Sequence, residues 1–202
     1  MKKHLLSTTV LIFIASLSVA QLPKIKAKTD GEKYKNWGKK PVESPDGPTD
    51  MWTMPSQMCE GPISESIKAS TTLSPQGKFK YLANFVCDDD PTTAWVEGNT
   101  DYGIGEFLEI KDWNIMNNSI TILNGYQFSK AVWEANSRVK SFKVSLNGKD
   151  ICVLELADVM GAQTFAIPEK WQNGNFKFTI LEVYPGIKYK DTAISGIFTC
   201  GG

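Results

Sequence analysis

The strongest constraint on the fold is an alternating pattern in the second half of the chain. Polar and apolar side chains alternate along residues 139–146 (VKSFKVSL). A period of two residues is typical of a half-buried β-strand. Asn147 and Gly148 follow, a pair that tolerates the positive φ angles of a type I′ turn, and residues 151–154 (ICVL) resume an apolar run. This pattern predicts a β-hairpin.

The same character extends over residues 58–202. Short segments rich in β-branched and aromatic residues are separated by turn-forming pairs such as Asn124-Gly125 and Pro185-Gly186. The further strands that we predict are 81–86, 106–111, 119–124, 164–167, 176–183 and 192–200. Helical character is confined to a short stretch at 156–160. About eight strands in some 145 residues predict one all-β domain, a jelly-roll sandwich of two antiparallel sheets.

The first 20 residues have the pattern of a secretory signal peptide. Lys2 and Lys3 precede a largely apolar run over residues 10–20, which ends in Ser18-Val19-Ala20, a small-x-small cleavage site. This run is too short to span a bilayer, and no later stretch is long enough. We therefore expect an exported protein that is periplasmic, displayed on the cell surface or secreted.

Residues 21–57 differ from the rest of the chain in composition. They are rich in Lys, Gly, Pro and Asp, with almost no aliphatic periodicity. Such a segment buries too little apolar surface to offset its conformational entropy. We expect a disordered polar linker between the signal peptide and a domain at 58–202.

Charge argues against a nucleic-acid partner. Removing the two lysines of the signal peptide leaves 20 basic and 22 acidic residues. The lysines are scattered and Arg138 is the only arginine, so the sequence lacks the basic stripe that binds phosphates.

The cysteines and the single histidine limit the chemistry. Cys59, Cys87, Cys152 and Cys200 form an even set in a chain that we expect to be exported, which favours two disulfides. We favour the pair Cys59–Cys200, because both flank the domain, and this leaves Cys87–Cys152. The only histidine, His4, is removed with the signal peptide. Hydrolysis by a histidine-assisted serine or cysteine is thereby excluded, and with no C-x-x-C pair a zinc site is not expected.

Several motifs together resemble a known family. Residues 88–95 (DDDPTTAW) resemble the D-G-x-x-x-T-x-W signature of discoidin, or coagulation factor 5/8 type C, domains, with Asp89 in place of the glycine. A narrower branch, the glycan-binding, translocation-type domain attached to bacterial NAD glycohydrolases, is similar at 96–98 (VEG), 103–106 (GIGE), 124–126 (NGY), 136–140 (NSRVK), 184–186 (YPG) and 191–195 (DTAIS). The resemblance implies a galactose-binding-like jelly roll and carbohydrate binding. It does not imply NAD hydrolysis, which belongs to a separate catalytic domain in those proteins.

One segment offers the groups that sugar recognition needs. A sugar ring presents a flat apolar face and several hydroxyls, which match aromatic rings and fixed polar groups respectively. Tyr126, Trp133, Asn136 and Arg138 fall between two predicted strands, with Asn124 where the segment begins. We predict the glycan site there. The alternative is that Trp133 covers the edge of the core while Arg138 pairs with a surface carboxylate; for Trp95 we expect core packing.

Carboxylates supply two further candidate sites. Glu97 and Glu106 flank the Gly-rich stretch 98–105, where they could contact a glycan or act as a glycosidase pair. Asp88, Asp90 and Thr93 offer oxygen ligands for a structural calcium. Related domains complete that site with a late glutamate, whose matching position here is Gly196. The alternative is a structural turn in which Asp88 and Thr93 hydrogen-bond locally.

Three functional hypotheses remain. The first is an exported glycan-binding module without catalytic activity or cofactor. The second is a protein-binding or adhesion module on the same fold. The third is a small carboxylate-based glycoside hydrolase.

Overall fold

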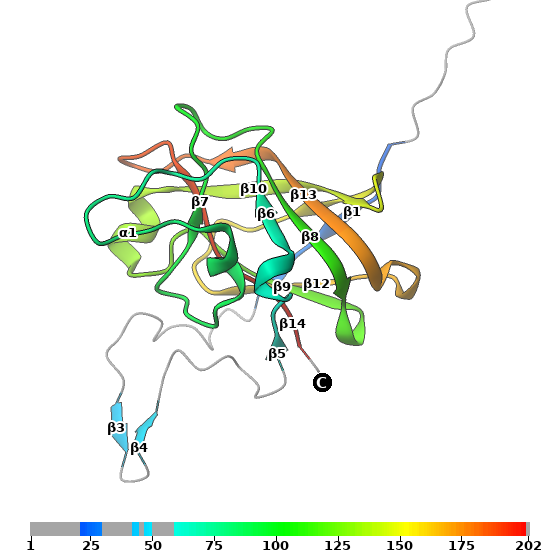
Figure 1. Cartoon of the computed structure of the whole chain (residues 1–202), viewed down its shortest axis with the longest axis horizontal. Helices are drawn as coiled ribbons and strands as arrows, with labels where there is room; N and C mark the ends of the chain where they lie inside the picture. The colour runs from blue at the N-terminus through cyan, green and yellow to red at the C-terminus, as the bar shows by residue number, and fades with distance from the viewer. Residues whose placement is uncertain (1–20, 30–41, 45–46, 50–58, 201–202) are drawn as a thin grey trace, which may run out of the picture.

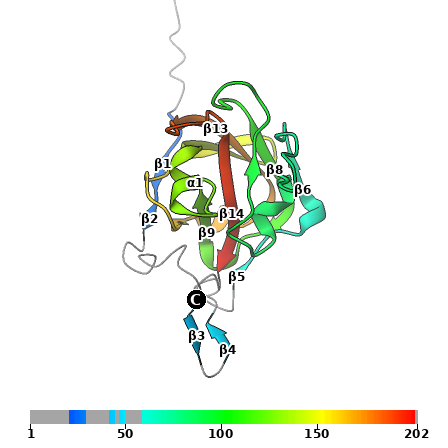
Figure 2. The same ribbon diagram turned by 90° about the vertical axis from the view of Figure 1, so that its left-hand side faces the viewer.

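The protein folds as a sandwich of two antiparallel β-layers (Figures 1 and 2). The computed structural model describes residues 21–29, 42–44, 47–49 and 59–200. One layer has the strand order β12-β9-β14 and the other β11-β10-β13-β8-β6. The layers join where β14 pairs in parallel with the start of β10. The predicted signal peptide at 1–20 and most of the predicted linker lie outside the described residues.

The elements follow each other with few helical turns. The strands are β1 (Lys24–Lys26), β2 (Lys28–Thr29), β3 (Val42–Ser44), β4 (Gly47–Thr49), β5 (Cys59–Glu60), β6 (Ile67–Ala69), β7 (Trp95–Val96), β8 (Phe107–Asn114), β9 (Ser119–Asn124), β10 (Ser137–Leu146), β11 (Lys149–Glu155), β12 (Ala162–Ala166), β13 (Asn173–Tyr184) and β14 (Thr192–Cys200). The helical elements are α1 (Lys130–Ala135) and the 3-10 turns η1 (Ser64–Ser66), η2 (Ala83–Cys87), η3 (Met116–Asn118) and η4 (Glu169–Trp171). In the described part of the chain, no helix is long and apolar enough to cross a membrane.

The predicted hairpin is confirmed. Strands β10 and β11 pair antiparallel, with Leu146 opposite Lys149. Asn147 has a φ of 50° and Gly148 a φ of 80°, so both central residues have the positive φ of a type I′ turn. Five further predicted strands also form, and the ends of each lie within three residues of the expected ones. They are the strands predicted at 106–111, 119–124, 164–167, 176–183 and 192–200.

Two local predictions are wrong. Residues 81–86 form the 3-10 turn η2 instead of a strand, and residues 156–160 contain no helix. Short apolar runs do not distinguish a strand from a helical turn. The one α-helix of the described residues, α1, follows Ser129, whose side chain accepts a hydrogen bond from the backbone N–H of Val132 and caps the helix.

Large apolar side chains from both layers meet in one core. Phe142 and Phe178 from one layer and Phe165 and Ile197 from the other are completely buried. Trp95 is also fully buried, as expected, and its indole N–H donates to the carbonyl of Thr71 at 2.9 Å.

The start of the predicted linker belongs to the sandwich. Strand β1 pairs in parallel with β11, and β2 pairs antiparallel with β12, so residues 24–29 connect the edges of the two layers. Ile25 packs against the core, and Lys24 forms an ion pair with Glu155 at 2.6 Å. The expectation of disorder from residue 21 is therefore wrong for 21–29. Composition does not reveal these strands, because their backbone hydrogen bonds come from pairing with the edges of the sheets and not from the short segment itself.

The cysteine predictions have different outcomes. Cys152 is buried in the core and Cys87 lies in η2, and both are free thiols, so the predicted Cys87–Cys152 disulfide is wrong. Burial raises the pKa of the Cys152 thiol to about 12 and, together with nearby carboxylates, that of Cys87 to about 11. Cys59 and Cys200 are direct partners in the antiparallel β5–β14 register. The Cα atoms of two residues that are opposite each other in a strand pair are close enough for a disulfide. The register is therefore compatible with the Cys59–Cys200 disulfide, which stays a prediction.

Peptide mapping without reduction tests this pairing. We expect Cys59 and Cys200 in one disulfide-linked peptide after export to an oxidising compartment, with Cys87 and Cys152 recovered as free thiols and the buried Cys152 alkylated only after unfolding. Mass spectrometry of the digested, alkylated protein reads both. A linked peptide that contains Cys87 or Cys152 would contradict the structure.

Substitution in the N-terminal strand tests its contribution to stability. We expect Ile25→Ala to lower the free energy of unfolding by about 1–2 kcal/mol, because a partly buried isoleucine loses its contacts with the core. The exposed Lys28→Ala on the next strand is the control and should change it by less than about 0.5 kcal/mol. Urea denaturation measures both, and equal effects would contradict the packing of Ile25.

Candidate functional site

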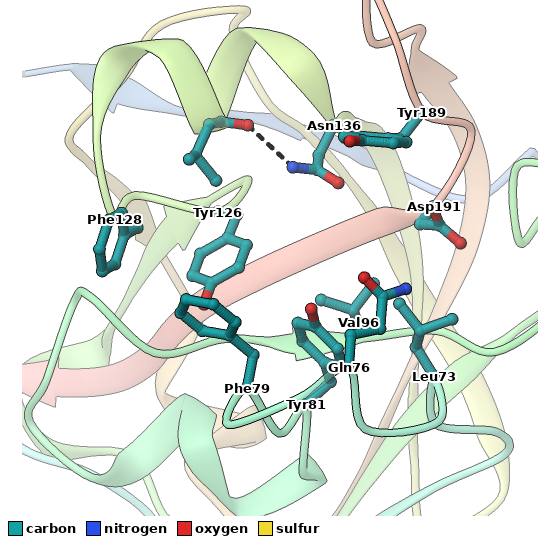
Figure 3. A pocket seen from close by; sticks show the side chains of 11 residues that line it. Leu73, Gln76, Phe79, Tyr81, Val96, Tyr126, Phe128, Asn136, Tyr189 and Asp191 are labelled. Atoms are coloured by element: carbon teal, nitrogen blue, oxygen red, sulfur yellow. Dashed lines mark hydrogen bonds between the residues drawn. The ribbon is translucent and has the colours of Figure 1, made fainter.

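A pocket of about 270 Å³ opens where four segments meet near the start of β14. Its walls come from the loop before η2, from β7, from the segment that contains α1, and from the loop between β13 and β14 (Figure 3). The residues that line it are Leu73, Gln76, Phe79, Tyr81, Val96, Tyr126, Phe128, Val132, Asn136, Tyr189 and Asp191.

Aromatic rings dominate the pocket. Tyr126 packs edge-to-face against Tyr81 and Phe128, with ring centroids 6.3 and 6.2 Å apart. Phe128 meets Phe79 in the same way at 6.4 Å. Phe79, Phe128 and Tyr189 are between 41% and 46% exposed, which is unusual for large apolar side chains. The pocket therefore presents ring faces and edges to solvent.

Polar groups without protein partners converge on the same space. Neither the Gln76 amide, the Asp191 carboxylate nor the Tyr81 and Tyr126 hydroxyls hydrogen-bond to another described side chain or backbone group. Burial raises the pKa of both tyrosines, so their hydroxyls stay protonated and can donate. Figure 3 shows Gln76 and Tyr81 on one side of the pocket and Asn136 on the other.

Asn136 is held in place by α1. Its amide nitrogen donates to the carbonyl of Val132 at 2.9 Å, as the dashed line in Figure 3 marks. The amide oxygen is left to accept from a ligand. Of the residues predicted for the glycan site, the structure thus brings Tyr126 and Asn136 into the pocket.

Asn124, Trp133 and Arg138 lie behind the pocket instead of in it. Asn124 is fully buried and its amide exchanges two hydrogen bonds with the backbone of Val139, at 2.8 and 3.0 Å. The Trp133 indole donates to the carbonyl of Asn124 at 2.8 Å. The prediction that these side chains face a ligand is contradicted by their burial, and Trp133 has the structural role that was the alternative.

Arg138 also has the alternative role. It is 6% exposed, and its guanidinium lies 4.5 Å from the centre of the Trp133 ring. Three hydrogen bonds of 2.8–3.0 Å reach the half-exposed carboxylate of Asp158. The remaining N–H groups donate to the carbonyls of Asn136 and Pro185 at 3.0 and 3.2 Å. All five donors of the guanidinium are therefore used within the protein.

These contacts explain the Asn124-Gly125-Tyr126 motif. Asn124 joins β9 to β10, and Tyr126 reaches the pocket. Gly125 has a φ of +78°, and a Cβ there would lie 2.6 Å from both Arg138 and Trp133. Only glycine allows this close approach.

The two glutamates do not form a catalytic pair. Glu97 is fully buried and accepts from the backbone N–H groups of Asn99 and Thr192 at 2.8 and 3.0 Å. Burial raises its pKa. Glu106 accepts from the hydroxyls of Ser70 and Thr71. Neither lines the pocket, so the prediction that they contact a glycan is not supported by their positions, and both anchor the 97–106 loop.

The acidic turn is held by its own hydrogen bonds. The Asp88 carboxylate accepts from the backbone of Asp90 at 3.0 Å and from the hydroxyl of Thr93 at 2.8 Å, while Asp90 accepts twice from Thr92. Among the described residues, no three acidic, histidine or cysteine side chains group to hold a metal ion. Two carboxylates already engaged in the turn do not fit the six to eight ligands of calcium, so the structural alternative describes this segment better.

Several of the pocket residues that sequence analysis missed lie on two loops, while others, such as Val96 and Phe128, come from β7 and from the segment that contains α1. Gln76 and Phe79 lie in one, and Tyr189 and Asp191 in the other. Each loop follows a proline and carries an aromatic residue between two lysines, at 78–80 (KFK) and 188–190 (KYK). Aromatic residues in such polar turns are a signal that could have indicated an exposed binding surface.

Replacing Arg138 tests whether its role is structural. We expect Arg138→Ala to lower the free energy of unfolding by about 2–3 kcal/mol, because it leaves two carbonyls and a partly buried carboxylate without donors. The control is Lys140→Ala, on the same strand as Arg138, which removes an exposed ion pair with Glu182. It should leave the unfolding midpoint near that of the wild type. Chemical denaturation compares them. A fully stable Arg138→Ala protein would contradict this role.

Comparisons with solved structures agree on the fold. The CBM32-1 and CBM32-2 domains of Clostridium perfringens ZmpB, solved in complex with GalNAc, are 9% identical with a TM-score of 0.51, over 92% of this chain and 42% of that one. A structure that also contains the M60 catalytic domain of ZmpB is 10% identical in sequence with a TM-score of 0.51, over 92% of this chain and 17% of that one. The family 32 CBM of C. perfringens NanJ, solved in complex with galactose, is 14% identical in sequence with a TM-score of 0.48. The match covers 70% of this chain and 98% of that one.

Comparison at the sequence level gives the family. No curated protein matches the chain. The model of the NAD glycohydrolase translocation F5/8 type C domain matches residues 58–199, which is more than half of the chain. This protein therefore belongs to the NAD glycohydrolase translocation F5/8 type C domain family, and its sandwich is the jelly roll of the galactose-binding-like superfamily.

Proposed function

We propose that this protein is an exported glycan-binding module that carries out no covalent chemistry and holds a sugar ring in the pocket between Tyr126, Asn136 and Asp191. The observation that carries the proposal is the combination of aromatic walls with polar groups that have no hydrogen-bond partner among the residues the structure describes. Unpartnered polar groups next to ring faces match the two surfaces of a sugar.

The chemistry of the polar groups favours a ligand rich in hydroxyls. The Asp191 carboxylate and the free oxygen of Asn136 are acceptors, whereas the tyrosine hydroxyls and the Gln76 amide can also donate. Several hydroxyls on one ring can satisfy such a mixed set. The similar fold of the ZmpB domains was solved in complex with GalNAc, which supports a sugar ligand here.

The other two hypotheses have less support. A glycosidase needs two carboxylates that face one cleft, but Glu97 is buried and Glu106 is bonded to two hydroxyls. A protein partner could use the exposed aromatic rings, but it would not by itself explain why so many polar groups converge inside the pocket. A binding experiment separates these possibilities.

The test is a glycan array probed with residues 21–202 and two minimal variants. We expect Asp191→Asn to weaken binding roughly 10- to 100-fold, because it removes a charged acceptor, and Tyr126→Phe roughly fivefold, because it removes only one hydroxyl. Asp112→Asn, on an exposed position of β8, is the matched control and should bind like the wild type.

Each outcome decides a different point. Binding to one sugar class that the two pocket variants weaken supports the proposal. Full binding by both variants would place the sugar elsewhere, and a blank array from folded protein would overturn the glycan proposal in favour of a protein partner. Turnover of a bound glycan would contradict the absence of catalysis.

A further inference from the structure

The mouth of the pocket carries the same three-residue pattern on two facing walls. Lys78, Phe79 and Lys80 lie on one wall, and residues 188–190 (KYK) lie on the other. Phe79 and Tyr189 line the pocket, and Figure 3 places them on opposite sides of it. All six residues are exposed. Each wall of the mouth thus carries an aromatic ring flanked by lysines in sequence, in a chain that has an excess of acidic residues once the predicted signal peptide is removed.

Two of the lysines lie against the rings of the mouth. The Lys78 ammonium is 5.5 Å from the centre of the Phe79 ring, and the Lys188 ammonium is 4.8 Å from that of Tyr189. Lys190 instead lies 5.7 Å from the ring of Tyr102, which does not line the pocket. The contacts of Lys78 and Lys188 place positive charge beside a pocket ring on each of the two walls.

These cations form no ion pair with any described carboxylate. Elsewhere exposed lysines do pair, for example Lys143 with Asp150 at 3.1 Å and Lys140 with Glu182 at 2.6 Å. An exposed cation–π contact is weak, so a lysine leaves a ring readily when an anion approaches. The mouth is therefore a positively charged surface whose charges are available to a ligand.

The interior of the pocket has the opposite preference. The Asp191 carboxylate there would repel an anionic group, and the donors of the interior, the Gln76 amide and the hydroxyls of Tyr81 and Tyr126, are uncharged groups that serve neutral sugar hydroxyls. An acidic ligand is favoured only if its uncharged ring enters the pocket while its charge stays outside, against the lysines.

We propose that the protein recognises acidic glycans, in which a neutral sugar occupies the pocket and a neighbouring unit that carries carboxylate, sulfate or phosphate contacts Lys78 and Lys188. This inference rests on the proposed function, because it assigns the part of the glycan outside the pocket. The lysines add affinity and selectivity for charged chains, and salt weakens their contribution.

The experiment compares matched ligands. An array presents each neutral oligosaccharide beside its sulfated and its uronic-acid-containing counterpart, and residues 21–202 are applied at about 50 mM and about 300 mM NaCl. We expect the acidic member to bind roughly three- to tenfold more tightly at the lower salt concentration, with most of this preference lost at the higher one.

Two double variants locate the preference. Lys78→Gln with Lys188→Gln should abolish the preference for acidic ligands while neutral ligands bind as before. Lys111→Gln with Lys149→Gln removes the same charge from exposed positions outside the pocket and should leave the preference intact. Circular dichroism confirms that both variants fold.

The failures are distinguishable. Binding of neutral ligands without any gain for acidic ones overturns this inference and leaves the proposed function in place. A blank array overturns the proposed function itself. Binding to vesicles of phosphatidylcholine and phosphatidylserine with no acidic-glycan preference would assign the lysines to a membrane surface and also overturn the inference.

Discussion

The buried guanidinium of Arg138 is the contact on which the binding end of the molecule depends. Its five donors reach Asp158, Asn136 and Pro185, and its plane lies against Trp133. It therefore joins α1, the loop after β11 and the loop after β13. Two of these three segments supply walls of the pocket, so this side chain fixes their separation without contacting the ligand.

Buried and exposed polar groups have different tasks in this domain. Asn124 and Glu97 are completely buried and satisfy backbone groups of β10 and of the start of β14, respectively. Leaving either backbone group unpaired in the interior would be costly, which explains why polar residues occupy these positions. The groups that remain available to a ligand line the pocket, among them Gln76 and Asp191 on loops. The buried polar groups thus support the pocket without facing the ligand.

Much of the fold was predictable from local patterns, but less of the site. Alternation and the Asn147-Gly148 turn predicted the central hairpin correctly, and five further strands followed from composition. The site prediction contained Tyr126 and Asn136, which line the pocket, but also Arg138, which does not. An arginine near aromatic residues looks the same in sequence whether it faces solvent or the core. Only its five internal hydrogen bonds distinguish the two.

The sequence by itself determined most of the strand pattern and the family, because each depends on residue identity or on neighbours along the chain. The tertiary structure decided which side chains share the pocket, since its walls come from residues as distant in sequence as Gln76 and Asp191. It also decided that residues 24–29 complete the sandwich, because a short polar segment becomes a strand only when a sheet edge offers hydrogen-bond partners. Contacts between distant loops and edges depend on the assembled sandwich, and no local pattern records them.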